Sequence, residues 1–147
     1  MNIHKKSENL YIVLTAIFIA SLVSCNLIFQ KFFEIEIWLP FIGAYKFEQS
    51  VGLLPYPITF IVTDIVSEIY GRKKANQVVT AGLFASLFML IIVSISDYVS
   101  AAQWSPISKN EFHKVFGLSG AAVFASMMAY LVAQYIDVRA FHFWKKL

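Results

Sequence analysis

Four long apolar stretches constrain this 147-residue chain more than any other feature. They cover roughly residues 10–29, 51–70, 77–96 and 115–136. A helix needs about 20 mostly apolar residues to cross the hydrocarbon core of a bilayer. The pattern therefore predicts an all-α fold, a polytopic transmembrane helical bundle of four spans, formed by a single integral membrane domain over 1–147.

The composition agrees with this prediction. The chain is 59% hydrophobic and 14% charged, whereas soluble domains are typically about 45–50% apolar and about 25% charged. These values argue against a soluble enzyme, a disordered tail and a surface nucleic-acid binder, so we expect a lipid bilayer and no direct nucleic acid as partner. The single cysteine excludes an intramolecular disulfide and a cysteine-cluster metal site.

The lysine and arginine residues predict how the spans are oriented. If both termini lie on one side of the membrane, eight of the twelve basic residues lie on that side. Basic loops are retained preferentially in the cytoplasm. We therefore expect both termini to be cytoplasmic.

The loop after the first span contains the pattern of a strand. Apolar and acidic residues alternate from Phe33 to Ile37, which is typical of a half-buried strand. Residues 44–48 can return beside it around Pro40 and Gly43. We therefore expect a short outer β-hairpin between the first two spans.

The N-terminus also allows another interpretation. Lys5 and Lys6, an apolar run and the sequence Leu22-Val-Ser-Cys25 resemble a bacterial lipoprotein signal peptide. Cys25 would then be lipidated and begin the mature protein. The three further apolar stretches argue against this interpretation.

The second apolar stretch carries the residues that are best suited to bind a ligand or a proton. At about 100° per residue, one half of a helix over 59–71 holds Thr59, Phe60, Thr63, Asp64, Ser67 and Glu68. An acidic residue at the centre of a membrane helix costs about 2.5–3.5 kcal/mol. This half should therefore face the bundle interior or a water-filled cavity. Like charges disfavour joint ionisation, so a proton shared by Asp64 and Glu68 would suit coupling to a proton gradient.

Simpler interpretations of this stretch stay open. Glu68 would pair with Arg72 at the cytoplasmic end, or the segment would lie on the membrane surface as an amphipathic helix. Surface helices usually carry Lys and Arg on the polar face, and this face carries none.

The ends of this stretch also carry signals. Pro55 and Pro57 predict a late helix start with irregular backbone over 51–56, a feature of interrupted transporter spans. Alternatively, Pro57 merely opens a helix at the interface. Gly71, followed by three basic residues, predicts a helix stop.

The same residues resemble a family signature. The run from Pro57 to Gly71 (PITFIVTDIVSEIYG), followed by Ala75 and Gly82, resembles the signature of the queuosine precursor transporter family. Two further resemblances are the Asn…Lys pair at Asn26 and Lys31 and the Asp…Phe-His motif over 137–142. The resemblance extends from about residue 10 to residue 142.

The resemblance implies a transporter and not an enzyme. Its substrates would be queuosine precursors for tRNA modification, either queuine or a 7-deazaguanine such as 7-cyano- or 7-aminomethyl-7-deazaguanine. Its location would be the bacterial cytoplasmic (inner) membrane. The family is similar to small vitamin-uptake membrane proteins with about six helices, so this C-terminally short sequence would need a homo-oligomer, or helices from another chain, to complete it.

A guanine-type edge presents a ring N–H beside an amino group, and a carboxylate accepts hydrogen bonds from both. Asp64 or Glu68 would provide that carboxylate, while Tyr56, Phe60 or Tyr70 would stack on the base. The predicted substrate-binding residues are Asn26, Tyr56, Phe60, Thr63, Asp64, Glu68, Gln134 and Asp137. In the alternative interpretation, Asn26 and Gln134 only bridge helices, and Asp137 pairs with Arg139.

Two other functional classes compete with a transporter. Asp64, Glu68, Asp137 and His142 are residue types found in metal sites, but their spacing forms no recognised ligand set, so we expect no metal or other cofactor. The chain would otherwise be an inactive fragment or a substrate-binding membrane subunit energised by a separate ATP-driven partner.

Overall fold

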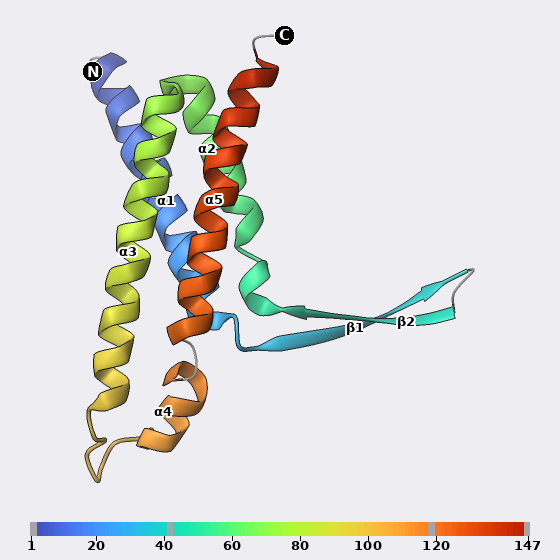
Figure 1. Cartoon of the computed structure of the whole chain (residues 1–147), viewed down its shortest axis with the longest axis vertical. Helices are drawn as coiled ribbons and strands as arrows, with labels where there is room; N and C mark the ends of the chain where they lie inside the picture. Colours follow the sequence, from blue (N-terminus) through green and yellow to red (C-terminus); the bar gives the residue numbers. More distant parts are fainter. Residues whose placement is uncertain (1–2, 41–42, 118–119, 146–147) are drawn as a thin grey trace.

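The computed structural model describes residues 3–40, 43–117 and 120–145, with side chains from 7–40, 43–117 and 124–145. Its elements are α1 (Ile3–Ile28), β1 (Phe32–Leu39), β2 (Gly43–Ser50), the 3-10 helix η1 (Val51–Leu53), α2 (Tyr56–Tyr70), α3 (Arg72–Tyr98), α4 (Lys109–Phe116) and α5 (Gly120–Trp144). Helices α1, α2, α3 and α5 stand side by side, and the hairpin projects from the side of the bundle (Figure 1). The first turn of α1 and the last turn of α5 lie at the same end.

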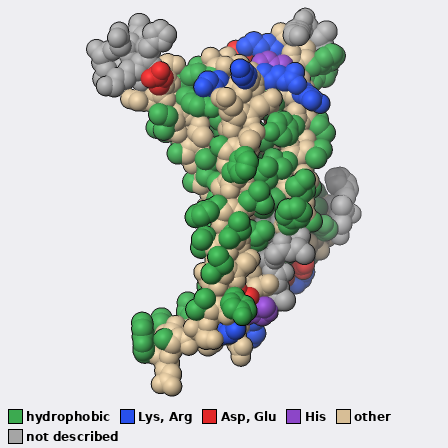
Figure 2. Space-filling model, turned by 60° about the vertical axis from the view of Figure 1, so that its left-hand side comes forward, with side chains coloured by type: hydrophobic (Ala, Val, Ile, Leu, Met, Phe, Trp, Pro, Cys, Tyr) green, Lys and Arg blue, Asp and Glu red, His purple; other side chains and the backbone are tan. Residues whose placement is uncertain are grey.

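Three helical segments in the described part of the chain are long and apolar enough to cross a membrane: Ser7–Ile28, Val51–Tyr70 and Arg72–Tyr98. They correspond to the first three predicted spans. Hydrophobic side chains cover the length of the bundle between ends that carry charged groups (Figure 2). The chain is therefore a mostly helical, multi-pass membrane protein.

The predicted fourth span over 115–136 overlaps two helices and differs from both in its bounds. Its first residues belong to α4, residues 118–119 lie outside the described residues, and α5 continues to Trp144. α4 begins at a capping box, in which the Ser108 side chain accepts a hydrogen bond from the Glu111 amide while the Glu111 carboxylate accepts one from the Ser108 amide. The two hydrogen bonds from Ser108 also lower the pKa of Glu111. Whether α5 crosses the membrane stays a prediction.

The predicted hairpin is confirmed. β1 and β2 are antiparallel, with Glu36 opposite Lys46. The Lys46 ammonium lies 2.6 Å from the Glu34 carboxylate and 3.5 Å from that of Glu36. Because side chains alternate along a strand, these charges share one face of the hairpin. The other face is apolar and includes Phe33, Ile35, Ile37, Leu39, Tyr45 and Phe47.

The second span begins as the prolines predict. η1 and a turn occupy residues 51–55, and α2 starts at Tyr56. This irregular segment packs closely on α1, because a Cβ atom at Gly52 would lie 2.6 Å from the Cys25 carbonyl oxygen. Gly52 is thus the buried point at which this segment contacts α1, whereas Leu53 and Leu54 are exposed. α2 ends at Gly71, whose φ of 82° favours glycine.

The core lies where α1, α2, α3 and α5 meet. Phe18, Val66, Val78 and Val138 are almost completely buried there. α1 and α3 approach closely because α3 has no side chain at Gly82, where a Cβ atom would lie 2.5 Å from the Phe18 ring. Close packing of this kind drives helix association in lipid.

Candidate functional site

The buried face of α2 differs from the predicted one. Thr59, Thr63 and Ser67 point inward as expected, but Val62 and Val66 are buried beside them. Asp64 is half-buried and Glu68 is exposed. The helix is therefore rotated relative to the prediction, because its small hydroxyl residues form the close contact and the two carboxylates lie at the edge of that contact.

Gln134 of α5 lies at the centre of a hydrogen-bond network with α2. Its side chain is fully buried. The Gln134 carbonyl oxygen accepts a hydrogen bond from Thr63 (3.3 Å), and its amide donates to the Tyr130 hydroxyl (2.7 Å) and to the Thr59 hydroxyl (3.5 Å). The structure thus brings Thr63 and Gln134 together, and the predicted helix bridge is present.

An aromatic cluster lies on the hairpin side of this network. The Tyr130 ring contacts Tyr56 edge-to-face at 5.2 Å between centroids and Phe60 at 6.2 Å. Tyr56 and Phe60, both predicted to stack on a base, are thus brought together by Tyr130.

A cavity of about 230 Å³ adjoins Tyr56 at the base of the hairpin. It is lined by residues of α1, β2, η1, α2 and α5, among them Cys25, Asn26, Gln49, Tyr56 and Ser126. The Asn26 amide donates a long hydrogen bond of 3.5 Å to the Ser86 hydroxyl of α3. Asn26 and Tyr56 therefore share one cavity that has both polar and aromatic groups.

The carboxylates of Asp64 and Asp137 lie near each other, close enough for their charges to interact. The Asp137 Oδ2 atom is buried and has no hydrogen-bond partner among the described residues. Asp137 pairs with no arginine in that part of the chain. The carboxylate whose charge acts on Asp64 is therefore that of Asp137 of α5.

Glu68 is engaged elsewhere. Its carboxylate lies 2.7 Å from the Lys145 ammonium, and its side chain is 57% exposed. Glu68 does form an ion pair, but its partner is Lys145 at the end of α5 and not the predicted Arg72. This separates Glu68 from the other predicted site residues.

These contacts follow one another along two parallel helices. Tyr56, Thr59, Thr63 and Asp64 of α2 meet Tyr130, Gln134 and Asp137 of α5 in the same order. We call this set the α2–α5 seam. It leads from the cavity at the hairpin base toward the end of the bundle where Arg72 and Lys145 lie.

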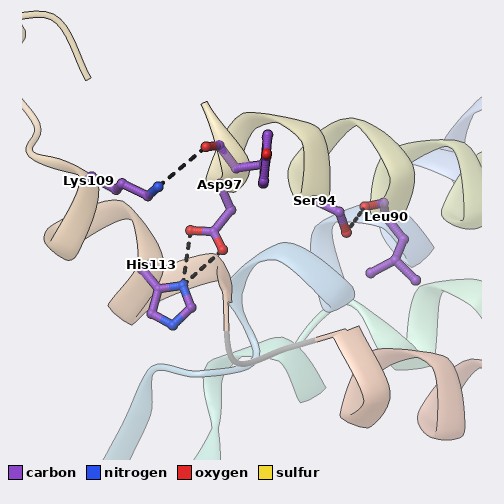
Figure 3. A network of polar contacts seen from close by, with 6 residues as sticks. Leu90, Ser94, Asp97, Lys109 and His113 are labelled. Carbon is purple, nitrogen blue, oxygen red and sulfur yellow. Dashed lines mark hydrogen bonds and ion pairs between the residues drawn. The ribbon is translucent and has the colours of Figure 1, made fainter. Parts of the chain in front are cut away.

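A separate polar cluster lies at the other end of α3. The His113 Nδ1 atom of α4 is 2.8 Å from an Asp97 carboxylate oxygen, and the Lys109 ammonium donates to the Tyr98 carbonyl (Figure 3). These contacts hold α4 against α3. The described residues contain no group of three or more histidine, cysteine, aspartate or glutamate side chains that would hold a metal ion.

Comparisons with known proteins assign the chain to a family by sequence. Residues 50–147 match the family model described as "Putative vitamin uptake transporter". The chain belongs to this family. The matched region contains α2, α5 and thus the whole α2–α5 seam.

Three curated relatives of the chain are named as transporters. The chain is 26% identical over 130 residues to a "Probable queuosine precursor transporter" of Haemophilus influenzae, covering 82% of this chain and 51% of that protein. It is 25% identical over 101 residues to the "Queuosine precursor transporter" of Escherichia coli, covering 69% and 44%. The "Probable queuosine precursor transporter" of Bacillus subtilis is 27% identical over 97 residues, covering 66% and 42%.

The chain spans about half the length of the curated relatives that it matches. No solved structure matches the chain. The family assignment therefore rests on sequence, and the site geometry comes from this structure.

Two residues that contact the predicted site residues were not predicted from the sequence. Tyr130 links the aromatic cluster to Gln134, and Ser86 contacts Asn26. Tyr130 had a detectable signal, because it lies one helical turn before Gln134 and therefore on the same face of α5. Ser86 had none, because its contact depends on how α1 meets α3.

Proposed function

We propose that this chain imports queuosine precursors across the bacterial cytoplasmic membrane for tRNA modification. The substrates are queuine or 7-deazaguanines such as 7-cyano- or 7-aminomethyl-7-deazaguanine. The names of three relatives and the polar α2–α5 seam through an apolar bundle support this proposal. Within the seam, the observation that carries most weight is the Asp64–Asp137 pair, because unpaired carboxylates within membrane helices are costly and usually functional.

The substrate enters the cavity at the hairpin base and meets Asn26 and Tyr56. The flat base stacks on the aromatic cluster of Tyr56, Phe60 and Tyr130, as exposed bases do on aromatic side chains. Its ring N–H and amino group then donate to a carboxylate of Asp64 or Asp137. Thr63 and Gln134 hold α2 and α5 in register around this site.

The Asp64–Asp137 pair also provides the proton site of the proposal. Two neighbouring carboxylates disfavour joint ionisation, so one proton is shared when the substrate is absent. One ionised carboxylate accepts the substrate N–H groups while the other keeps the proton, so substrate and proton are carried inward together. This arrangement couples uptake to a proton gradient without Glu68, which is bound to Lys145.

Both termini are cytoplasmic in this proposal, and α5 is the fourth crossing. The support is that the first turn of α1, the last turn of α5 and the basic residues after Gly71 lie at one end of the bundle. Exposed apolar residues on α3 and α5, such as Phe84, Phe88 and Val132, leave room for the partner helices. These helices come from a second copy of the chain or from another chain.

The decisive experiment measures queuosine in the tRNA of bacteria that lack both precursor synthesis and their own transporter. Cells expressing the chain and fed limiting precursor should regain queuosine. Asp64→Asn should lower uptake about tenfold or more, the effect of losing roughly 1.4 kcal/mol of binding. Glu8→Gln is the matched control, because it removes one carboxylate from an exposed position of α1.

A binding measurement keeps the proposal testable if the chain needs partner helices for transport. Equilibrium dialysis of the detergent-purified chain should show binding of 7-aminomethyl-7-deazaguanine and not of adenine, whose ring nitrogen beside the amino group accepts rather than donates. Binding that survives Asp64→Asn and Asp137→Asn together would refute the carboxylate site. A chain that inserts well yet neither binds nor restores queuosine would refute the proposed function.

A further inference from the structure

A second pocket lies at the opposite end of the bundle from the hairpin, between the start of α3 and the end of α5. It has a volume of about 570 Å³, and its polar lining consists of Arg72, Arg139 and His142. Its apolar walls are formed mainly by Ile136, Phe143 and Trp144. We call it the α3–α5 pocket. It is separate from the α2–α5 seam, because none of its lining residues belongs to the seam.

We infer that the α3–α5 pocket binds the phosphate group of an anionic membrane lipid. Two arginines that lie 67 positions apart in the sequence converge on the pocket, and no acidic side chain lines it. Within the described part of the chain, neither Arg72 nor Arg139 forms an ion pair. Planar guanidinium groups bind phosphate oxygens in pairs of hydrogen bonds, so the unpaired arginines match an anionic headgroup.

His142 adds a further donor to this pocket. Its Nε2 atom is buried and has no hydrogen-bond partner among the described residues. The His142 ring contacts Phe141 edge-to-face at 5.5 Å between centroids, which fixes the orientation of the ring. Because His142 lines the pocket, a headgroup bound by the two arginines lies beside its ring.

The apolar walls favour a lipid over free phosphate as the source of the anion. Ile136, Phe143 and Trp144 are all more than half exposed, and they extend the pocket along the outer surface of α5. Tryptophan is enriched where the hydrocarbon core meets the headgroups. Basic pockets between membrane helices at such a level are typical of sites for lipid headgroups. Figure 2 shows lysine and arginine side chains gathered at this end of the bundle, next to the apolar surface.

Trp144 provides a direct test, because it is a wall of the pocket. The full chain carrying Trp38→Phe and Trp104→Phe keeps Trp144 as its single tryptophan, and both replaced rings are exposed. In detergent micelles, brominated phosphatidylglycerol should quench Trp144 at lower concentration than brominated phosphatidylcholine. Arg72→Gln should raise the phosphatidylglycerol concentration needed by about fivefold, and combination with Arg139→Gln by about twentyfold.

Lys73→Gln is the matched control, because it removes one positive charge from the neighbouring residue, which lines a different pocket. It should leave the lipid preference unchanged. Circular dichroism checks that each variant keeps its helices, and Arg72→Lys should recover part of the preference in a folded protein. Equal quenching by both lipids, or equal effects of Arg72→Gln and Lys73→Gln, would overturn the inference. Loss of the preference in millimolar inorganic phosphate, but not in chloride of equal ionic strength, would assign the pocket to free phosphate instead.

Discussion

Gln134 and Asp137 lie one turn apart on α5, yet their surroundings are opposite. Gln134 is fully buried and has hydrogen bonds with three side chains, two on α2 and one on its own helix. Asp137 has a buried carboxylate oxygen without any partner among the described residues, and Asp64 nearby adds a second negative charge. The bundle thus satisfies a neutral amide internally, whereas one oxygen of Asp137 has no partner among the described residues, as the proposed function requires. This contrast separates a layer that holds helices together from a layer suited to a ligand or a proton.

The largest effect should come from removing the unpaired charge. We predict that Asp137→Asn lowers precursor uptake about tenfold or more, because the substrate loses a carboxylate acceptor. Thermal stability in detergent should be unchanged or higher, since a buried charge without a partner destabilises a fold. Queuosine content of tRNA and thermal unfolding of the purified protein measure the two effects. Lower stability with normal uptake would instead assign Asp137 a structural role like that of Gln134.

Replacing the satisfied amide should have the opposite signature. Gln134→Leu removes the hydrogen bonds of a fully buried amide with Thr59, Thr63 and Tyr130, and we expect a loss of about 1–3 kcal/mol in the free energy of unfolding. Uptake should fall only as far as the amount of folded protein falls. Denaturant unfolding in detergent gives the first quantity, and uptake per folded protein gives the second. Val132→Leu, at an exposed position of α5, is the control and should change stability by less than about 0.5 kcal/mol.

The smallest effect should come from replacing Glu68. This replacement tests whether the carboxylate site is limited to Asp64 and Asp137. Glu68→Gln breaks an exposed ion pair with Lys145, and such pairs contribute about 0–1 kcal/mol. We expect uptake within about twofold of the unchanged chain, a difference of roughly 0.4 kcal/mol. A loss of uptake as large as that of Asp64→Asn would return Glu68 to the site, as the sequence pattern first suggested.

Local signals predicted much of the fold. Alternation of apolar and acidic residues predicted β1, two prolines predicted the late start of α2, and Gly71 predicted its end. Each of these depends on a few neighbouring residues, so the sequence alone contains the information. The capping box of α4 was equally local and was overlooked, because the apolar run after it dominated the assignment.

The site was harder to predict, because it depends on contacts between distant segments. A helical wheel places Asp64 and Glu68 on the same half of α2 but does not say which helix packs there. The packing of α5 against Thr59 and Thr63 brings Asp137 close enough for its charge to act on Asp64, whereas Glu68 forms an ion pair with Lys145. Residue type predicted which groups matter, whereas their pairing required the tertiary structure.

The short turn at Gly71 has a consequence for how the protein is made. With a single residue between them, α2 and α3 form a tight helical hairpin that precedes α5 in the chain. The hydroxyls of Thr59 and Thr63 already donate to backbone carbonyls of their own helix, so these two groups do not depend on α5 while they wait in the membrane. Gln134 follows in the last helix of the described bundle. Its side chain then packs against threonine hydroxyls that hydrogen bonds within α2 already orient.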